Sequence, residues 1–584
     1  MSPSAVAATF ACDELLGNSS RILLARRMGV QPVKLSGLSK ATLYEADHTS
    51  FMDLAQKLFA SPASRAPFIA ITGLMRRSGV VSVLVHEDVQ DEPYFSRLSR
   101  PVARELKTLN GDPRVTQITF WSSRLSRTRL PARTKGVPHG GLLASCVIVS
   151  PRDGKADWDG YIYEAIVGYP TKLRGRERLP MENTYYHVGQ PILVRVGPDH
   201  SYVLGAAYFC QQNGSTSVCA HSCLKMVLWH SQVGSSQQPP TDKINGFIKR
   251  WRPEHDVRKG LFLEDVMKVC EEFGATTMTL DCRDQPDISP HEFAYLLVES
   301  GIPTIVVFAT KRETKSEMHH MFPVVGHTMN PDLWLPAALD RYPELQKLRL
   351  ISSKHTFVSS SEFAPEVVVH DDLLGPYMHL SPTSLTRGPT DKADRSACVM
   401  WVFGVVPNTL KLPHPPYTAQ QVGARYVHSL WGDAASSVAE PWRSRLVEEP
   451  LTPTTLVLRT QLIRRDFYLR HLGETKDHYG NSAFTSEAQK KLLQKRLPAQ
   501  FWMVEFSTTR LFSSNRSKLG EVLLPLGLVE DVPGFLRGNG DAEPPLAFRL
   551  LGEMTLYGAG GRHIPLRLKS HTPLFRRRRM ENEF

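Results

Sequence analysis

The chain has 584 residues, of which 41% are hydrophobic and 22% are charged. This is the composition of a globular protein too long for a single core, so about two to four domains are expected. No run of about 18 apolar residues occurs, so no membrane-spanning helix is predicted, and no basic region precedes the N-terminal apolar stretch as in a secretory signal. Eight cysteines in this length do not indicate a disulfide framework, and free thiols in a cytoplasmic compartment are the simpler interpretation.

The net charge of +12 is spread along the chain, and its densest basic cluster is the C-terminal Arg576–Arg579. Such a tail can bind nucleic acid or anionic lipid, but a solvated terminus is the simpler interpretation. Nucleic acid is therefore not an expected partner, and nucleic-acid binding through the tail stays as an alternative.

Patterns of hydrophobic residues divide the first part of the chain into two units. Residues 1–139 mix a helix at 50–60 with a strand at 80–87, which predicts an N-terminal α/β domain. Residues 140–204 then carry successive strand patterns separated by turn signals, "LLASCVIVSP", "GYIYEAIVGYP" and "QPILVRVG". This pattern predicts a mostly β segment, with antiparallel strands, that leads into the core of the protein.

The next unit, 205–412, begins with helices and ends with strands. Helical patterns cover 219–230, 261–274 and 289–300, and strand patterns cover 303–308, 321–327, 365–372 and 398–406. A proline-rich stretch around 407–420 predicts a boundary. Residues 413–584 are predicted to form a C-terminal α+β domain with a basic tail, and we find no catalytic constellation in it.

The segment "QQNGSTSVCAHSCLKMVLWH" (211–230) suggests a nucleophile. A thiol attacks a carbonyl as the thiolate, and the N–H groups and dipole at the start of a helix favour that anion. The cap-rich "NGSTS" predicts that a helix starts at Val218 or Cys219. Cys219 therefore lies where an activated cysteine is expected, and Gln212 or Gln211 upstream could donate a hydrogen bond to an oxyanion.

A cysteine nucleophile also needs an imidazole and a group that orients it. The segment "MHHMFPVVGHTMN" offers three histidines on one predicted strand, His319, His320 and His327. The end of the next strand offers two carboxylates, Asp371 and Asp372, and Asn330 is a further orienting candidate. From these residues alone, the base and its orienting group stay open.

The segment "VCAHSCLKMVL" resembles the nucleophile segment of the bacteriocin-leader (double-glycine) peptidases, a branch of the papain-like cysteine peptidases. The family pattern is a glutamine, about five residues, and Cys-Gly/Ala-x-x-Cys-Leu-x-Met, whose first cysteine is the nucleophile; here that cysteine is Cys219. Papain-like enzymes also carry His-x5-Gly on a strand, which His320 and Gly326 match. The stretch "HDDLLGPYMHLS" resembles the family's strand-ending Asp-Pro segment, with Asp371 as the aspartate and Asp372 in place of proline.

This resemblance covers about residues 205–410 and implies the fold class α+β. In it, a papain-like central domain (205–412), with the nucleophile helix packed on an antiparallel sheet, is flanked by N- and C-terminal α/β or α+β domains. The chain departs from the family pattern in three ways: six residues separate Gln212 from Cys219, Pro323 interrupts the histidine strand, and an insertion at 333–348 could form a lid.

The implied function is that of a cysteine peptidase or isopeptidase with the triad Cys219, His320 and Asp371 and with Gln212 at the oxyanion. The substrate is then a protein or peptide, and no cofactor or metal is expected. An inactive papain-like binding scaffold and an acyl transferase using the same cysteine are alternatives. A zinc site made by Cys219, His221 and Cys223 is a further one, although no second pair of ligands follows it.

Overall fold

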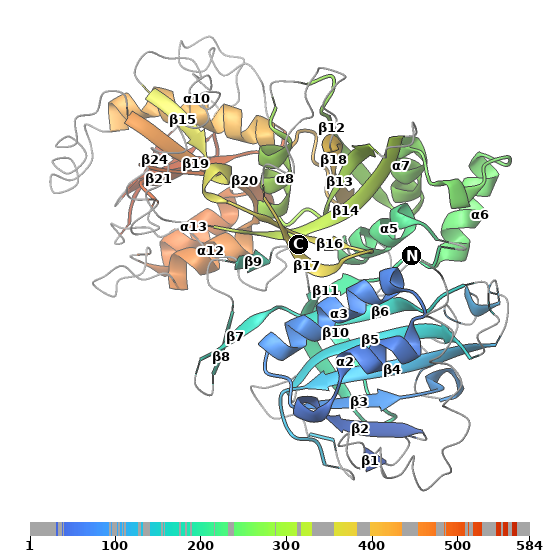
Figure 1. Cartoon of the computed structure of the whole chain (residues 1–584). Coiled ribbons are helices and arrows are strands. Elements are labelled where there is room, and N and C mark those ends of the chain that lie inside the picture. Colours follow the sequence, from blue (N-terminus) through green and yellow to red (C-terminus); the bar gives the residue numbers. More distant parts are fainter. Residues whose placement is uncertain are drawn as a thin grey trace, which may run out of the picture.

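The computed structural model describes residues 31–568 with gaps. The longer gaps are 132–140, 330–354, 382–396, 435–453, 475–483 and 528–544, and the others have seven residues or fewer. The basic tail Arg576–Arg579, Asn330 and the insertion 333–348 lie outside the described residues. The fold is mixed α+β, as predicted, and contains three large sheets in which antiparallel pairing predominates (Figure 1).

The first sheet has eight strands in the order β1-β2-β3-β4-β5-β6-β11-β10. They are β1 (Gln31–Pro32), β2 (Ala41–Glu45), β3 (Ser82–His86), β4 (Pro113–Trp121), β5 (Leu142–Pro151), β6 (Tyr161–Gly168), β10 (Gln190–Arg195) and β11 (Ser201–Phe209). Helices α2 (Phe51–Leu58) and α3 (Pro62–Arg77) lie across this sheet in Figure 1. Both begin at a serine whose side chain accepts a hydrogen bond from a backbone N–H of the first turn.

The second sheet has the strand order β12-β18-β13-β14-β16-β17, and β9 also pairs with β14. Its strands are β9 (Thr184–Tyr186), β12 (Ala275–Asp281), β13 (Thr304–Lys311), β14 (Glu317–Thr328), β16 (Val367–Asp371), β17 (Gly375–Leu380) and β18 (Ala397–Pro407). Helices α5 (Cys219–His230), α6 (Thr241–Trp251) and α7 (Leu263–Glu272) share one core with it. Helix α8 (Pro290–Glu299) packs against the same strands through a different core cluster.

The third sheet has the order β15-β19-β20-β21-β22-β23-β24. Its strands are β15 (His355–Ser359), β19 (Thr454–Arg464), β20 (Gln500–Thr508), β21 (Gly520–Leu524), β22 (Ala547–Leu550), β23 (Glu553–Tyr557) and β24 (His563–Arg567). Helix α10 (Pro416–Ala434) belongs to the core that joins the second and third sheets, whereas α12 (Arg465–Glu474) and α13 (Glu487–Arg496) pack in a separate cluster. A two-stranded hairpin, β7 (Thr171–Arg174) and β8 (Glu177–Pro180), stands outside these sheets.

Strand pairing crosses the boundaries predicted from the sequence. Because β4 pairs with β5, the first sheet is continuous across the predicted division at 139/140. Strand β9, from that segment, pairs with β14 in the second sheet, and β15, from within 205–412, pairs in parallel with β19 in the third. Hydrophobic patterns indicate where strands form but not which partner each strand takes.

The hairpin of β16 and β17 is held against the first sheet. The Tyr377 hydroxyl donates to the Val167 carbonyl at 2.7 Å and accepts from the Ala207 N–H at 3.0 Å. Gly375, at φ +126°, begins β17, and a Cβ there would come within 2.6 Å of the Ala70 side chain on α3. The turn that follows Asp371 therefore needs glycine, both for its backbone conformation and for the close approach of α3. In the described part of the chain, no helix is both long and apolar enough to cross a membrane.

Candidate active site

Cys219 is the first residue of α5, as the cap-rich sequence before it predicts. The turn closes through Asn213 and Ser217, which exchange hydrogen bonds between side chain and backbone at 3.0 Å in both directions. Gly214 adopts φ +71° within this turn. As a first-turn residue, Cys219 has a backbone N–H with no partner inside the helix, and its side chain lies in the positive field of the helix N-terminus.

Cys219 differs from the other described cysteines in its exposure. It is partly exposed, whereas Cys146, Cys210, Cys223, Cys270 and Cys282 are buried. Cys223, one turn along α5, is fully buried in the core with Leu224 and Val227. Burial raises the pKa of the Cys223 thiol well above its usual value, and the neighbouring negative groups add to the rise. Among these thiols, Cys219 is the one that solvent reaches.

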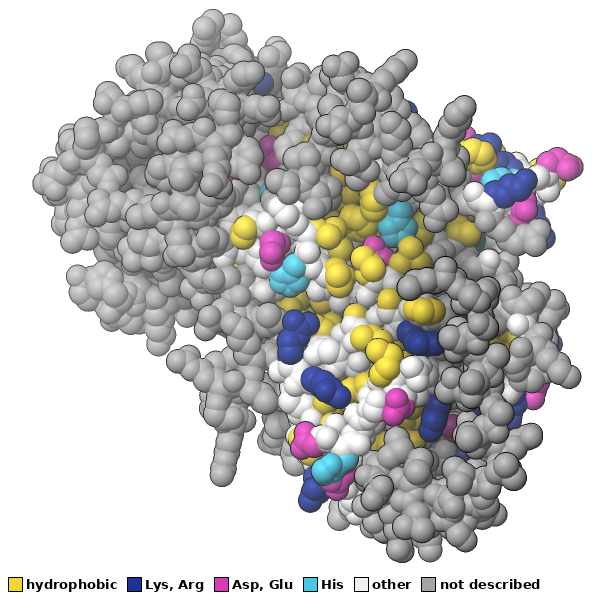
Figure 2. Space-filling view, viewed as in Figure 1, with side chains coloured by type: hydrophobic (Ala, Val, Ile, Leu, Met, Phe, Trp, Pro, Cys, Tyr) yellow, Lys and Arg dark blue, Asp and Glu magenta, His cyan; other side chains and the backbone are white. Residues whose placement is uncertain are grey.

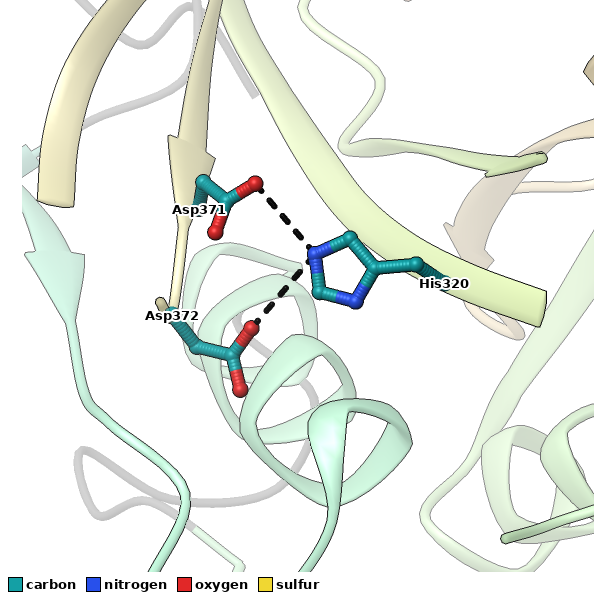
Figure 3. Close-up of side chains that lie close together, drawn as sticks. All are labelled: His320, Asp371 and Asp372. Carbon is teal, nitrogen blue, oxygen red and sulfur yellow. Dashed lines mark hydrogen bonds and ion pairs between the residues drawn. The ribbon is translucent and has the colours of Figure 1, made fainter. Parts of the chain in front are cut away.

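His320 and Asp371 come together because β14 and β16 are neighbouring antiparallel strands. Val324 is opposite Val369, so the end of β16 reaches the part of β14 that carries His320. The His320 Nε2 lies 3.2 Å from Asp371 Oδ2 and 3.7 Å from Asp372 Oδ1. Figure 3 shows both carboxylates on the same side of the ring.

Cys219 also lies close enough to His320 to act on the pKa of the ring. Because Nε2 faces the two carboxylates in Figure 3, Nδ1 is the ring nitrogen left for the thiol, and α5 packs against β14. Burial alone would lower the pKa of His320. The hydrogen bond to Asp371 and the nearby Cys219, with the charges of the two aspartates, outweigh burial and raise the pKa to about 10. The imidazole is therefore a cation at neutral pH.

Asp371 is held in its charged form by the turn that follows it. Burial acts to raise its pKa, but His320 and the N–H groups of Leu373 and Leu374 together lower it. These two N–H groups donate to Asp371 Oδ1 at 2.8 and 3.1 Å. These two donors were not predicted from the sequence. An aspartate followed by a short turn into glycine is the signal for them, since aspartate side chains accept hydrogen bonds from N–H groups two or three residues ahead.

Asp372 lies beside the same ring but in a different environment. Its side chain is 2% exposed, and in the described part of the chain neither carboxylate oxygen has a hydrogen-bond partner of good geometry. Burial raises the pKa of Asp372 to about 7; the charge of Asp371 adds to this rise, while His320 and the nearby N–H of Gln212 oppose it. The site thus contains one well-compensated carboxylate and one poorly compensated carboxylate.

The two candidate glutamines differ in their hydrogen bonds and in their exposure. The Gln211 side chain accepts from the Ile162 N–H at 3.1 Å and donates to the Ser64 carbonyl at 3.2 Å, so it joins β6 to α3. Gln212 is partly exposed, and its backbone N–H lies close to Asp372. Gln211 therefore has a structural role, and Gln212 lies beside the triad candidates.

The alternative histidines are placed elsewhere. His319 is exposed and its ring packs edge-on against Trp401. His327 is buried, with Nε2 2.9 Å from Glu299 and Nδ1 3.0 Å from the Thr328 carbonyl. Neither of them lies beside Asp371, so of the three histidines His320 joins the cluster with Cys219.

The proposed zinc ligands do not form a cluster. His221 Nδ1 accepts from the Val218 N–H at 3.3 Å, and Nε2 lies 2.7 Å from Asn245 Oδ1. Burial lowers the pKa of His221 to about 4, so this ring is neutral and helps to cap the helix. In the described residues, the group arranged to hold a metal ion is His320, Asp371 and Asp372.

No family model matches this chain, and no curated protein sequence matches it either.

Proposed function

We propose that this protein is a cysteine peptidase or isopeptidase in which Cys219 attacks a peptide bond of a protein or peptide substrate. One observation carries the proposal: Cys219, at the start of α5, is close enough to His320 to raise the pKa of that ring, and His320 Nε2 lies 3.2 Å from the Asp371 carboxylate. A thiol, an imidazole and an orienting carboxylate in this order are the parts of a nucleophilic triad. The papain-like fold suggested by the sequence is part of the same proposal.

The electrostatics favour a reactive form of the thiol. A cation held next to a cysteine at a helix N-terminus stabilises the thiolate. His320 supplies that cation, because its pKa is raised to about 10 despite partial burial. Asp371 fixes the ring with Nδ1 toward the sulfur and stays charged while doing so.

The reaction then follows from these positions. The Cys219 sulfur bonds to the carbonyl carbon, and the oxyanion accepts hydrogen bonds from the Cys219 N–H and from the Gln212 amide. His320 gives its Nδ1 proton to the leaving amine as the C–N bond breaks, which produces a thioester. The neutral ring next takes a proton from water, and the resulting hydroxide releases the acid and regenerates the cysteine.

An apolar surface beside the triad supports an extended substrate. Leu373 and Leu374, in the turn after Asp371, are 42% and 52% exposed. Figure 2 shows hydrophobic side chains gathered across the middle of this face, in the region where α5 and β17 lie in Figure 1. Exposed apolar side chains next to a reactive group provide contacts for substrate side chains.

The direct test is modification of single cysteines by an activated peptidyl ester at pH 7, followed by mass spectrometry of the intact protein and its peptides. Wild-type protein should be acylated at Cys219, and Cys219→Ala should reduce acylation to background. Cys223→Ala is the matched control, because this thiol lies on the same helix but is buried, and it should keep acylation within about twofold. Acylation that persists at full rate in Cys219→Ala would falsify the proposal.

The neighbouring glutamines give a second test. Gln212→Ala should slow acylation by about 10²–10³-fold if its amide stabilises the oxyanion. Gln211→Ala removes two hydrogen bonds between β6 and α3, so it should lower the thermal midpoint while leaving acylation by the folded protein unchanged. Equal rates for wild type and Gln212→Ala would remove the glutamine from the oxyanion site and leave the nucleophile in place.

A further inference from the structure

Three side chains beside the thiol make a compact set of metal-ligand atoms. His320, Asp371 and Asp372 each offer one atom, and these atoms all lie within 4.8 Å of one another. Two edges of the set are the distances from His320 Nε2, 3.2 Å to Asp371 Oδ2 and 3.7 Å to Asp372 Oδ1. In Figure 3 the two carboxylates and the nitrogen point toward a common space.

The two edges at His320 fit a tetrahedral ion, and the two carboxylates, within 4.8 Å of each other, would draw together around it. Zinc binds imidazole nitrogen and carboxylate oxygen at about 2.0–2.2 Å, so two ligands of a tetrahedral site are about 3.3–3.6 Å apart. One nitrogen and two carboxylate oxygens, with a water in the fourth position, form a ligand set that zinc takes and that magnesium or calcium, which prefer six or more oxygens, do not favour.

Asp372 points independently to a cation. Its side chain is buried, and among the described residues neither of its oxygens has a hydrogen-bond partner of good geometry. Its counter-charge is His320, which also serves Asp371. A buried carboxylate is costly without compensation, and an ion with two positive charges compensates both aspartates at once.

We propose that His320 Nε2, Asp371 and Asp372 bind a zinc ion and that this ion holds Cys219 in an inactive state. The inhibition rests on the proposed function, whereas the binding of zinc does not. Zinc takes the lone pair of Nε2, and the proton of that nitrogen goes to solvent. The coordinated ring then keeps one proton, on Nδ1, and cannot give it to a leaving amine without becoming an imidazolate.

The ligand set can be tested with the full chain and zinc chloride alone, by equilibrium dialysis against a weak chelator and measurement of bound metal. Wild type should bind one tight zinc per chain. Asp372→Asn should weaken the affinity at least tenfold, and Cys219→Ala should keep it within about threefold because sulfur is not a ligand. Tight zinc retained in Asp372→Asn, or lost in Cys219→Ala, would overturn the site.

Cobalt substitution identifies the ligand types in the wild-type protein, so it does not depend on whether a variant folds. Wild-type protein loaded with Co²⁺ should show the visible bands of a tetrahedral ion and no thiolate charge-transfer band. A thiolate band would move the metal to the cysteine and end the proposal.

Zinc should also slow acylation of Cys219 at least tenfold, with the rate restored by chelator. Peptide hydrolysis that requires zinc would overturn the inhibitory role. Tight zinc binding in a protein whose Cys219 is never acylated would support the metal site and contradict the peptidase proposal. Normal acylation without zinc binding would support the peptidase proposal and contradict the metal site.

Discussion

The two ends of β14 each hold a histidine beside a carboxylate, yet they have different environments. At one end, His320 is 15% exposed and lies 3.2 Å from Asp371. At the other end, His327 is 1% exposed and lies 2.9 Å from Glu299. Six residues of one strand therefore separate two similar pairs that differ in what surrounds them.

The surroundings decide what each pair can do. His327 has both nitrogens engaged, with Glu299 and with the Thr328 carbonyl, and Glu299 in turn pairs with Arg459 at 3.0 Å. Each group in this buried network contacts others of complementary charge or hydrogen-bonding type, which holds the second and third sheets together. His320 instead has a nitrogen for Cys219 and a poorly compensated neighbour, Asp372. A compensated pair stabilises a fold, whereas an incompletely compensated one is available for chemistry.

The largest expected difference between the two ends is in reactivity. His320→Gln should slow acylation of Cys219 by an activated peptidyl ester about 10²–10⁴-fold, because the general acid and base is lost. His327→Gln should leave this rate within about twofold in the folded protein and lower the thermal midpoint instead. Rates are compared at pH 7 by intact mass, with circular dichroism as a check on folding. If His327→Gln lost reactivity and His320→Gln kept it, the assignment of the two histidines would be reversed.

Local sequence signals predicted much of this site. The helix beginning at Cys219, the serine-proline start of α8 and the strands carrying His320 and Asp371 follow from caps and hydrophobic periodicity, and the structure confirms them. Pro323, which was predicted to interrupt the histidine strand, pairs with β13 and lies next to a register shift on the β16 side. Pairing with β16 begins at Val324, so His320 meets the end of β16 through its side chain and not through the backbone ladder.

The remaining features depend on contacts between distant segments. The pairing of β9 with the second sheet and of β15 with the third leaves no local pattern in the sequence. The alternation of residues in a strand is the same whichever strand it pairs with. The buried contact of Lys225 on α5 with Glu105, at 3.5 Å, was missed for the same reason. The state of Asp372 also could not be predicted, since its burial and its distance from His320 follow from the packing of the β16–β17 hairpin against the first sheet.

The second expected effect concerns stability at the other end of β14. Glu299→Gln removes the charge that pairs with Arg459 and leaves this buried guanidinium with Glu505, 3.4 Å away. Breaking a buried ion pair by removing one partner costs about 3–5 kcal/mol, so the thermal midpoint should fall markedly. The measurement is differential scanning calorimetry of the full chain.

A matched control for Glu299→Gln is an exposed ion pair beside the β16–β17 hairpin. Glu366 pairs with His379 at 2.7 Å, and both side chains are substantially exposed. Because exposed pairs contribute about 0–1 kcal/mol, Glu366→Gln should scarcely change the midpoint. Equal midpoint shifts for Glu299→Gln and Glu366→Gln would show that burial does not distinguish these pairs.

The smallest expected effect is the removal of the Asp371 charge, which tests how far the carboxylate tunes the ring. A charge-assisted hydrogen bond contributes about 1.5–3 kcal/mol, so Asp371→Asn should slow acylation of Cys219 about 10- to 100-fold at pH 7. The variant should also move the pKa of His320 from about 10 toward its ordinary value of about 6.5, although Cys219 and Asp372 still support the cation. Because the folded-state pKa is the higher one, the stabilisation from this charge is complete below about pH 6.5 and is lost as the pH rises toward 10. In Asp371→Asn, that loss of stabilisation should therefore be complete at a lower pH.

NMR titration of ¹³C-labelled histidine, with His320→Gln to assign the signal and Glu366→Gln as the control, measures the shift in the His320 pKa directly. A His320 titration that stays near pH 10 in Asp371→Asn would mean that the thiol and Asp372 hold the proton, and that Asp371 only positions the ring.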